Sequence, residues 1–227
     1  MNRLKLFILG MAIAMIPLCA LCPVHTNSQP VPVIQKLVIT DILNSCFQIK
    51  VTTEFGRGHG SGFMYKPGVI ATAAHVLEGA TDITIVDNAG NEYCPQRWCY
   101  HSESDVGFVF VDVLAMPINI CTEIQIGDTV YIVGTPFCDE FRNSVTKGIL
   151  SGKRNEEYPN LQMDCAANMG NSGGVILNEK MEVIGILNML FSPDRLYCGI
   201  TRGIPIDVVE TIWETRDEIC TSNKRVE

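Results

Sequence analysis

The sequence lacks an excess of positive charge, and this shortage narrows the classes of function that fit it. Its 227 residues include 17 lysines and arginines against 25 aspartates and glutamates, which gives a net charge of -8. Proteins that bind nucleic acids usually present clustered basic residues to phosphate. We therefore exclude a nucleic-acid partner. Hydrophobic residues make up 47% of the chain, as in an ordinary globular protein, so wholesale disorder is excluded too.

Residues suited to a metal site are few and scattered. The chain has four histidines far apart in the sequence, and no C-x-x-C pair is matched by a second one, although zinc sites of that kind need both pairs. The C-x-x-C pair that does occur, Cys19 and Cys22, lies in the N-terminal leader described next. We expect neither a metal nor an organic cofactor.

The chain also lacks a long unbroken apolar run. Two basic residues near its start precede an apolar stretch from Leu6 toward Leu21, which Pro17 interrupts. This order is typical of a secretory signal, whereas a membrane-spanning helix needs ~20 apolar residues. We interpret residues 1–22 as a signal peptide, with an uncleaved anchor or a lipoprotein as the alternative, and residues 23–40 as a linker. The protein is thus expected to be exported (periplasmic or secreted), with membrane contact through this segment alone.

Beyond the leader, the sequence contains eight of its ten cysteines. An even number of cysteines behind an export signal favours disulfide bonds. Their connectivity does not follow from the spacing.

The remaining sequence has no repeats and consists of short β-type runs broken by Gly, Asn and Asp. Residues 45–52, for example, alternate polar and apolar side chains, as a strand does. The runs fall into two sets, one in residues 41–120 and one in residues 121–220. Runs at this spacing predict a small antiparallel barrel followed by a sandwich or a second barrel. After Pro205, apolar residues recur at the spacing of a helix, which predicts a C-terminal helix. They are Ile206, Val209, Ile212 and Trp213.

One serine stands out because glycines surround it. Ser172 follows Gly170 and precedes Gly173 and Gly174, and glycine allows sharp turns and close approach to the main chain. Such a turn can aim the amides of Gly170 and Ser172 at one point, as an oxyanion hole requires. A polar surface turn is the alternative, because short motifs often arise by chance. A nucleophilic serine also needs a base and an acid that orients the base.

The chain offers both partners in the order His, Asp, Ser. His75 follows a strand-like run, and Asp105 begins another. Alone, the histidine would be a surface residue and the aspartate a strand cap. His59 and His101 are rivals for the role of base, but one lies in a glycine-rich loop and the other among Ser and Glu residues, while His25 lies in the linker.

Five short motifs, in order along the chain, resemble landmarks of trypsin-like serine proteases. They are residues 60–63 (GSGF), 72–76 (TAAHV), 104–107 (SDVG), 127–130 (GDTV) and 134–137 (GTPF). Segments 162–174, 182–186 and 203–209 are similar to the HtrA (Deg-like) branch of this family. The resemblance extends from about residue 42 to about residue 215. It implies two perpendicular six-stranded β-barrels with the active site between them.

The resemblance also implies the roles of individual residues. Ser172 would be the nucleophile, His75 the general base and then acid, and Asp105 the carboxylate that holds the imidazole tautomer. Gly170 and Ser172 would supply the oxyanion-hole amides, with Asn171 shaping that turn. These roles describe an exported serine endopeptidase that acts on polypeptides.

The wall of the primary substrate pocket is also implied by the resemblance. It would come from Ala166 and Ala167 and from Leu187, Asn188 and Met189. Because no acidic residue stands at its base, small or medium aliphatic P1 side chains are expected rather than basic ones. Asp164 is expected to be structural. Cys165 would pair with Cys198 beside this pocket, and Cys94 would pair with Cys99.

The chain departs from the branch in several ways. We expect no peptide-binding PDZ module, and Met169 stands where the branch usually has proline, which would loosen the oxyanion turn. The existence of homo-oligomers is left open. The alternative function is that of a protease-fold, chaperone-like protein that binds polypeptides with little or latent turnover.

Overall fold

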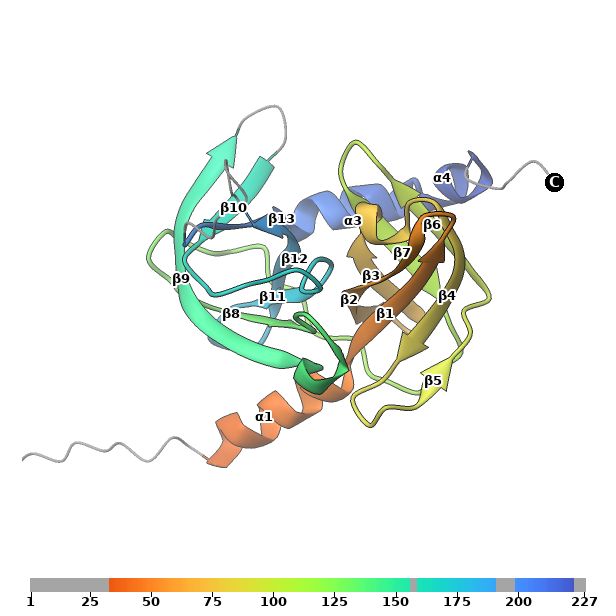
Figure 1. The fold of residues 1–227 in the computed structure, drawn as a ribbon. Helices are drawn as coiled ribbons and strands as arrows, with labels where there is room; N and C mark the ends of the chain where they lie inside the picture. Colours follow the sequence, from red (N-terminus) through yellow and green to blue (C-terminus); the bar gives the residue numbers. More distant parts are fainter. Residues whose placement is uncertain (1–32, 156–158, 191–198, 223–227) are drawn as a thin grey trace, which may run out of the picture. The chain divides into compact units, whose positions relative to one another are not determined.

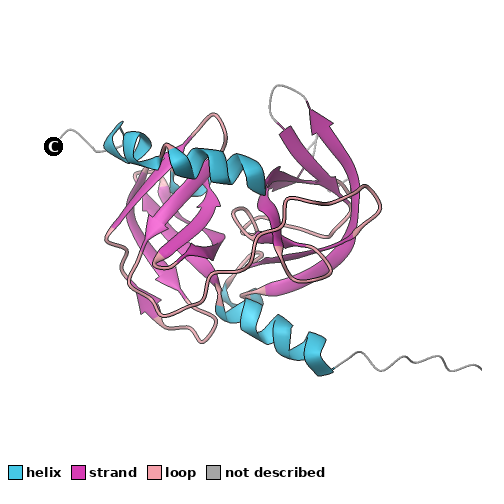
Figure 2. Ribbon diagram, turned by 180° about the vertical axis from the view of Figure 1, so that it is seen from behind, coloured by secondary structure: helices cyan, strands magenta, loops and turns pink. Residues whose placement is uncertain are grey.

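The computed structural model of the protein describes residues 33–155, 159–190 and 199–222. Figures 1 and 2 show two groups of β-strands, formed by the first and second halves of these residues. None of the helices within the described ranges is long and apolar enough to cross a membrane. The predicted leader and most of the predicted linker lie outside these ranges.

The first half contains two helices and seven strands. Helix α1 (Val33–Asn44) includes residues that we predicted to be linker, so this part of the prediction is wrong. Its many β-branched residues have low helix propensity, but Ile42 and Leu43 pack onto the core at its C-terminal end. The remaining elements are β1 (Cys46–Thr53), β2 (Gly56–Lys66), β3 (Val69–Ala73), α2 (Ala74–Leu77), β4 (Ala80–Val86), β5 (Glu92–Tyr93), β6 (Arg97–His101) and β7 (Val106–Phe110).

These seven strands form one antiparallel sheet in the order β5-β4-β1-β2-β3-β7-β6. Residues 94–96 alone separate the two edge strands, and they can bridge about 14 Å at most. Seven strands laid flat would place the edges about 29 Å apart, at ~4.8 Å per step. The sheet must therefore curl until its edges approach each other. It forms a half-barrel, where we predicted a closed barrel of six strands.

The second half forms the closed six-stranded barrel that was predicted, with the order β10-β13-β12-β11-β8-β9. Every pairing in it is antiparallel. Its elements are β8 (Thr129–Gly134), the 3-10 helix η1 (Asp139–Phe141), β9 (Ser144–Asn155), β10 (Pro159–Met163), β11 (Val175–Leu177), β12 (Val183–Leu190) and β13 (Thr201–Pro205). The all-β double-barrel class is thus confirmed.

The described residues form three hydrophobic clusters. One fills the curled sheet, around Phe47 and Ile70, and a second fills the closed barrel, around Ile132 and Leu150. The third contains residues of both halves, including Phe108 and Ile186. Several strands therefore bury both of their faces, which explains why their sequences are apolar in long runs. The third cluster packs the two halves against each other.

The C-terminal residues form the helix predicted from their spacing. Helix α3 (Ile206–Glu214) buries Ile206 and Val209, and Trp213 packs its ring edge-on against Tyr65 and Phe108 at centroid distances of 5.6 and 5.1 Å. Helix α4 (Arg216–Ser222) follows and contacts β6.

Helix α4 also carries the disulfide bond. Cys220 is bonded to Cys99 in β6, so the predicted Cys94–Cys99 pair is wrong, and Cys94 is a free, exposed thiol. Cys165 is free and buried, and Cys198, its predicted partner, lies outside the described ranges. Burial raises the pKa of the Cys165 thiol to about 12. This thiol therefore stays protonated and inert.

Removing the disulfide should destabilise the protein, because the bond joins residues 121 positions apart and limits the freedom of a long unfolded loop. We expect the Cys99→Ala/Cys220→Ala variant to lose about 3 kcal/mol of the free energy of unfolding. The melting temperature should fall by roughly 10 °C, as measured by circular dichroism without reductant. Cys94→Ala is the matched control and should melt within a degree or two of the parent. An unchanged melting temperature for the double variant would contradict the bond.

Candidate active site

The first functional side chain lies at the end of a buried strand pair. His75 is the second residue of α2, which follows β3 directly. Its neighbours Ala74, Val76 and Leu77 are buried, whereas its own side chain is 44% exposed. The short helix therefore anchors the backbone in the core and presents the imidazole to the cleft.

Asp105 holds both the backbone and the ring of this histidine. Its carboxylate accepts hydrogen bonds from the His75 backbone N–H at 2.9 Å and from the ring Nδ1 at 2.9 and 3.0 Å. An ionised carboxylate only accepts, so in the neutral imidazole Nδ1 carries the proton and Nε2 keeps its lone pair. Nε2 is then available as a base. Asp105 has a backbone φ of +51°, a region in which aspartate is better tolerated than most residues.

A turn anchored to both halves of the protein presents Ser172. The backbone carbonyl of Ser172 accepts from Ser61 N–H in β2 at 2.8 Å, and Gly173 N–H donates to the Leu187 carbonyl in β12 at 2.7 Å. Gly173 has a φ of +83°, and a Cβ there would overlap the side chain of Thr72. Glycine is therefore required at this position for both conformational and steric reasons.

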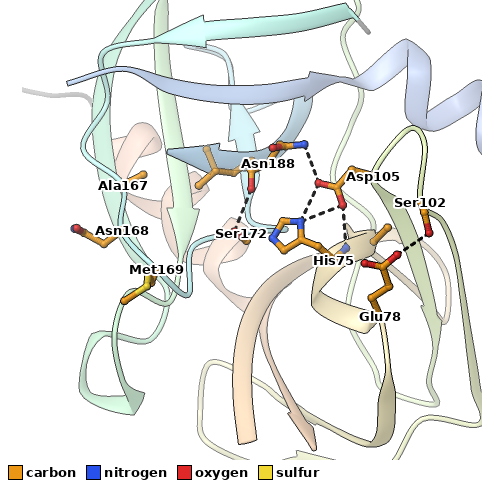
Figure 3. Close-up of a pocket in the computed structure, with 11 residues that line it drawn as sticks. His75, Glu78, Ser102, Asp105, Ala167, Asn168, Met169, Ser172 and Asn188 are labelled. Atoms are coloured by element: carbon orange, nitrogen blue, oxygen red, sulfur yellow. Dashed lines mark hydrogen bonds and ion pairs between the residues drawn. The ribbon is translucent and has the colours of Figure 1, made fainter. Parts of the chain in front are cut away.

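The serine hydroxyl is not yet directed at the histidine. Ser172 Oγ donates to the Asn188 carbonyl at 3.1 Å, and the described residues show no hydrogen bond between Ser172 and His75. Both side chains nevertheless line one pocket (Figure 3). Catalytic hydrogen bonds often tighten only when substrate binds, and rotation about the Ser172 Cα–Cβ bond would redirect the hydroxyl.

Asn188 has a role that the sequence did not suggest. It was predicted as pocket wall and does line the pocket, but its side-chain Nδ2 also donates to Asp105 Oδ2 at 2.7 Å (Figure 3). One residue thus contacts the nucleophile through its carbonyl and the carboxylate through its amide. The sequence does contain a signal for this role, because Asn188 is a polar residue near the end of the otherwise apolar strand β12.

The backbone N–H groups of Gly170 and Ser172 differ from that of Asn171 in their hydrogen bonding. The Met169 carbonyl accepts from Phe137 N–H at 2.8 Å. The Gly170 N–H, on the opposite side of the same trans peptide, therefore points away from Phe137. No acceptor for the N–H of Gly170 or Ser172 occurs in the part of the chain that the structure describes. Asn171 N–H instead donates to Asn168 at 3.0 Å, so it shapes the turn.

Ser61 fixes the far side of the same turn. Its hydroxyl donates to the Gly170 carbonyl and accepts from Thr135 N–H, both at 2.8 Å. His59 Nε2 lies 3.1 Å from the Thr135 carbonyl. His59 therefore supports the loop beside the turn and does not line the pocket.

The pocket beside Ser172 has a volume of about 490 Å³. Of the predicted wall residues, Ala167, Leu187 and Asn188 line it, whereas Ala166 is exposed and is not part of the lining. The Met189 side chain lies outside what the structure describes. Asp164 accepts from Ile149 N–H at 2.7 Å, which is the structural role predicted for it. The full lining is Ala74, His75, Glu78, Ser102, Asp105, Ala167, Asn168, Met169, Ser172, Leu187 and Asn188.

The other predicted residues do not join this site. His101 Nδ1 lies 3.1 Å from Ser104 Oγ, and His25 is outside the described residues. Within those residues, no three His, Cys, Asp or Glu side chains are grouped as metal ligands.

Comparisons with known proteins all match this chain to peptidases. The family model described as a trypsin-like peptidase domain matches residues 60–186. A probable periplasmic serine endoprotease, DegP-like, of Halomonas elongata is 36% identical over 165 residues, which are 69% of this chain and 34% of the relative. Protease Do-like 1, chloroplastic, of Arabidopsis thaliana is 29% identical over 69% of this chain and 38% of the relative. The chain thus spans little more than a third of the length of these relatives.

A solved structure shares the fold. The HtrA-type protease AlgW with tripeptide is 25% identical and superposes with a TM-score of 0.73, covering 80% of this chain and 62% of that chain. The likeness thus includes most of the described strands of both halves.

Proposed function

This chain belongs to the trypsin-like peptidase family, in its HtrA/DegP-like branch, and on that premise we propose that it is an exported serine endopeptidase that hydrolyses peptide bonds in polypeptides. The observation that carries the proposal is the hydrogen-bonded Asp105–His75 pair, whose free Nε2 lies in the same cleft as Ser172. Serine, histidine and aspartate in this relation form a nucleophile, its base and the group that orients the base.

The proposed reaction has two stages. Ser172 Oγ attacks the scissile carbonyl carbon while its proton moves to His75 Nε2, and the amides of Gly170 and Ser172 stabilise the oxyanion that forms. The C–N bond then breaks, and the leaving amine takes the proton from Nε2. Water then attacks the acyl-enzyme while its proton moves to the same nitrogen. The bond between the acyl carbon and Ser172 Oγ breaks, Oγ takes the proton back from Nε2, and the acid is released. Asp105 remains ionised throughout and stabilises the imidazolium.

We infer that the primary pocket accepts small or medium aliphatic side chains. Ala167 and Leu187 contribute apolar wall, and the described part of the lining has no acidic residue at this end that could pair with a basic P1 side chain. An exported location is supported by the periplasmic DegP-like relatives and by the leader predicted for residues 1–22.

A second candidate function is polypeptide binding with latent turnover. The orientation of the Ser172 hydroxyl favours it, because a hydroxyl bonded to the Asn188 carbonyl is not activated by His75. The two candidates differ in whether the nucleophile reacts without a further partner.

Labelling with a fluorophosphonate distinguishes the peptidase function from the latent polypeptide-binding function. This reagent phosphonylates a serine only when a base accepts the proton of its hydroxyl. We expect one adduct per chain, mapped by mass spectrometry to Ser172 and absent from the His75→Ala variant. An adduct at another serine would overturn the proposal. A folded chain that remains unlabelled until peptide is added would favour the latent function.

A further inference from the structure

The active-site pocket has two chemically different ends. Ala167 and Met169 lie at the end beside Ser172, while Glu78 and Ser102 lie at the other, with the His75 ring between them (Figure 3). The family resemblance assigned no role to Glu78 or Ser102. It places a carboxylate next to the catalytic histidine but outside the Asp105–His75 pair.

Glu78 and Ser102 are held by the same local structure that holds His75 and Asp105. Glu78 is the C-terminal cap of α2, and its backbone N–H donates to the Ala74 carbonyl at 3.0 Å. Ser102 belongs to the turn before β7, where its carbonyl accepts from Asp105 N–H at 3.1 Å. The Ser102 hydroxyl in turn donates to Glu78 Oε1 at 2.7 Å. The carboxylate is thus oriented by the protein.

The negative charge of Glu78, at this end of the pocket, has no basic side chain beside it in the described lining. Among the residues that the structure describes, the pocket lining includes no lysine or arginine. Both oxygens of Asp105 are occupied by His75 and Asn188. Glu78 is exposed, and in the described part of the chain its Oε2 has no hydrogen-bond or ion-pair partner. Oε2 is therefore an oriented acceptor that faces the cleft without a cation of its own.

We propose that Glu78 selects a lysine or arginine at P2, the substrate residue immediately before the one whose carbonyl is attacked. The inference rests on the proposed function and specifies the substrate further. The leaving amine must lie at the Nε2 edge of His75, since that nitrogen protonates it. Glu78 and Ser102 lie on the side of the His75 ring that faces Asp105 (Figure 3), and Asp105 accepts from Nδ1 of that ring. The side chain that reaches them therefore belongs to the acyl half of the substrate.

The test uses matched tripeptide aminocoumarin substrates with valine at P1 and lysine, glutamine or glutamate at P2. These substrates end at the leaving group, so they report on the acyl side alone. We expect kcat/KM to be roughly five-fold higher for lysine than for glutamine, in the range of a single exposed ion pair. The preference should weaken as salt increases, because screening shortens the range of exposed charges.

Three variants identify the source of the preference. Glu78→Gln should make lysine and glutamine at P2 equal, and Glu78→Lys should favour glutamate. Glu103→Gln is the matched control, because Glu103 is an exposed carboxylate next to Ser102 that does not line this pocket. It should retain the preference.

The possible results also distinguish a failure of the proposed role of Glu78 from a failure of the proposed peptidase function. Cleavage of the three substrates at equal rates, or a lysine preference that persists in Glu78→Gln, would overturn the role of Glu78 and leave the peptidase activity standing. Failure to cleave any of them, with Ser172 unlabelled by fluorophosphonate, would overturn both.

Discussion

The Ser172→Ala variant is expected to have a kcat/KM for peptide hydrolysis lower by at least roughly 10⁵-fold. Alanine leaves the turn unchanged, since it keeps the backbone bonds to Ser61 and Leu187, but it removes the atom that forms the acyl-enzyme. The oxyanion amides alone give only a small remainder of the rate. Initial rates with a fluorogenic peptide, measured at high enzyme concentration, would test this expectation.

The stability of Ser172→Ala is its internal control. The hydroxyl makes a single recorded hydrogen bond, to the Asn188 carbonyl, and that carbonyl can bond to water in the open cleft instead. The free energy of unfolding should therefore change by about 1 kcal/mol or less. A folded variant that keeps more than about a hundredth of the activity would show that another residue, or a contaminant, cleaves the peptide.

The Asp105→Asn variant is expected to lower kcat by about 10⁴-fold while leaving the fold intact. Asparagine tolerates the left-handed backbone at this position. Its amide oxygen can still accept the His75 backbone N–H. The NH₂ group then donates to Nδ1, which places the ring proton on Nε2, where it can no longer accept the proton of Ser172. Loss of rate with little change in KM is the expected signature in a full kinetic analysis.

Asp112→Asn makes the same chemical change at an exposed position just after β7. Its kcat should stay within about two-fold of the parent, as expected for a surface substitution. If Asp105→Asn were equally active, the assignment of Asp105 as the orienting carboxylate would be wrong. Thermal unfolding of both variants shows whether a loss of rate reflects loss of the fold.

The sequence predicted the parts of the protein that depend on local patterns. Alternation and turn residues gave the two sets of strands, and the spacing after Pro205 gave α3. The order of His75, Asp105 and Ser172 predicted which side chains would come together, and the structure places them in one pocket.

The parts that local patterns missed depend on tertiary contacts. Helix α1 forms from residues of low intrinsic helix propensity, because Ile42 and Leu43 pack on the core. The partner of Cys99 is set by where α4 meets β6, which no spacing of cysteines reveals. The amide contact of Asn188 with Asp105, and the place of Glu78 at the far end of the pocket, depend on segments distant in sequence.

The attachment of the Ser172 turn to both halves has a consequence for the timing of activity. Ser61 in the first half holds Gly170 and Ser172, while Leu187 in the second half holds Gly173. A chain in which only one half has folded thus has no positioned nucleophile and no oxyanion turn. In the proposed mechanism, peptide hydrolysis therefore requires that both halves are folded and packed against each other.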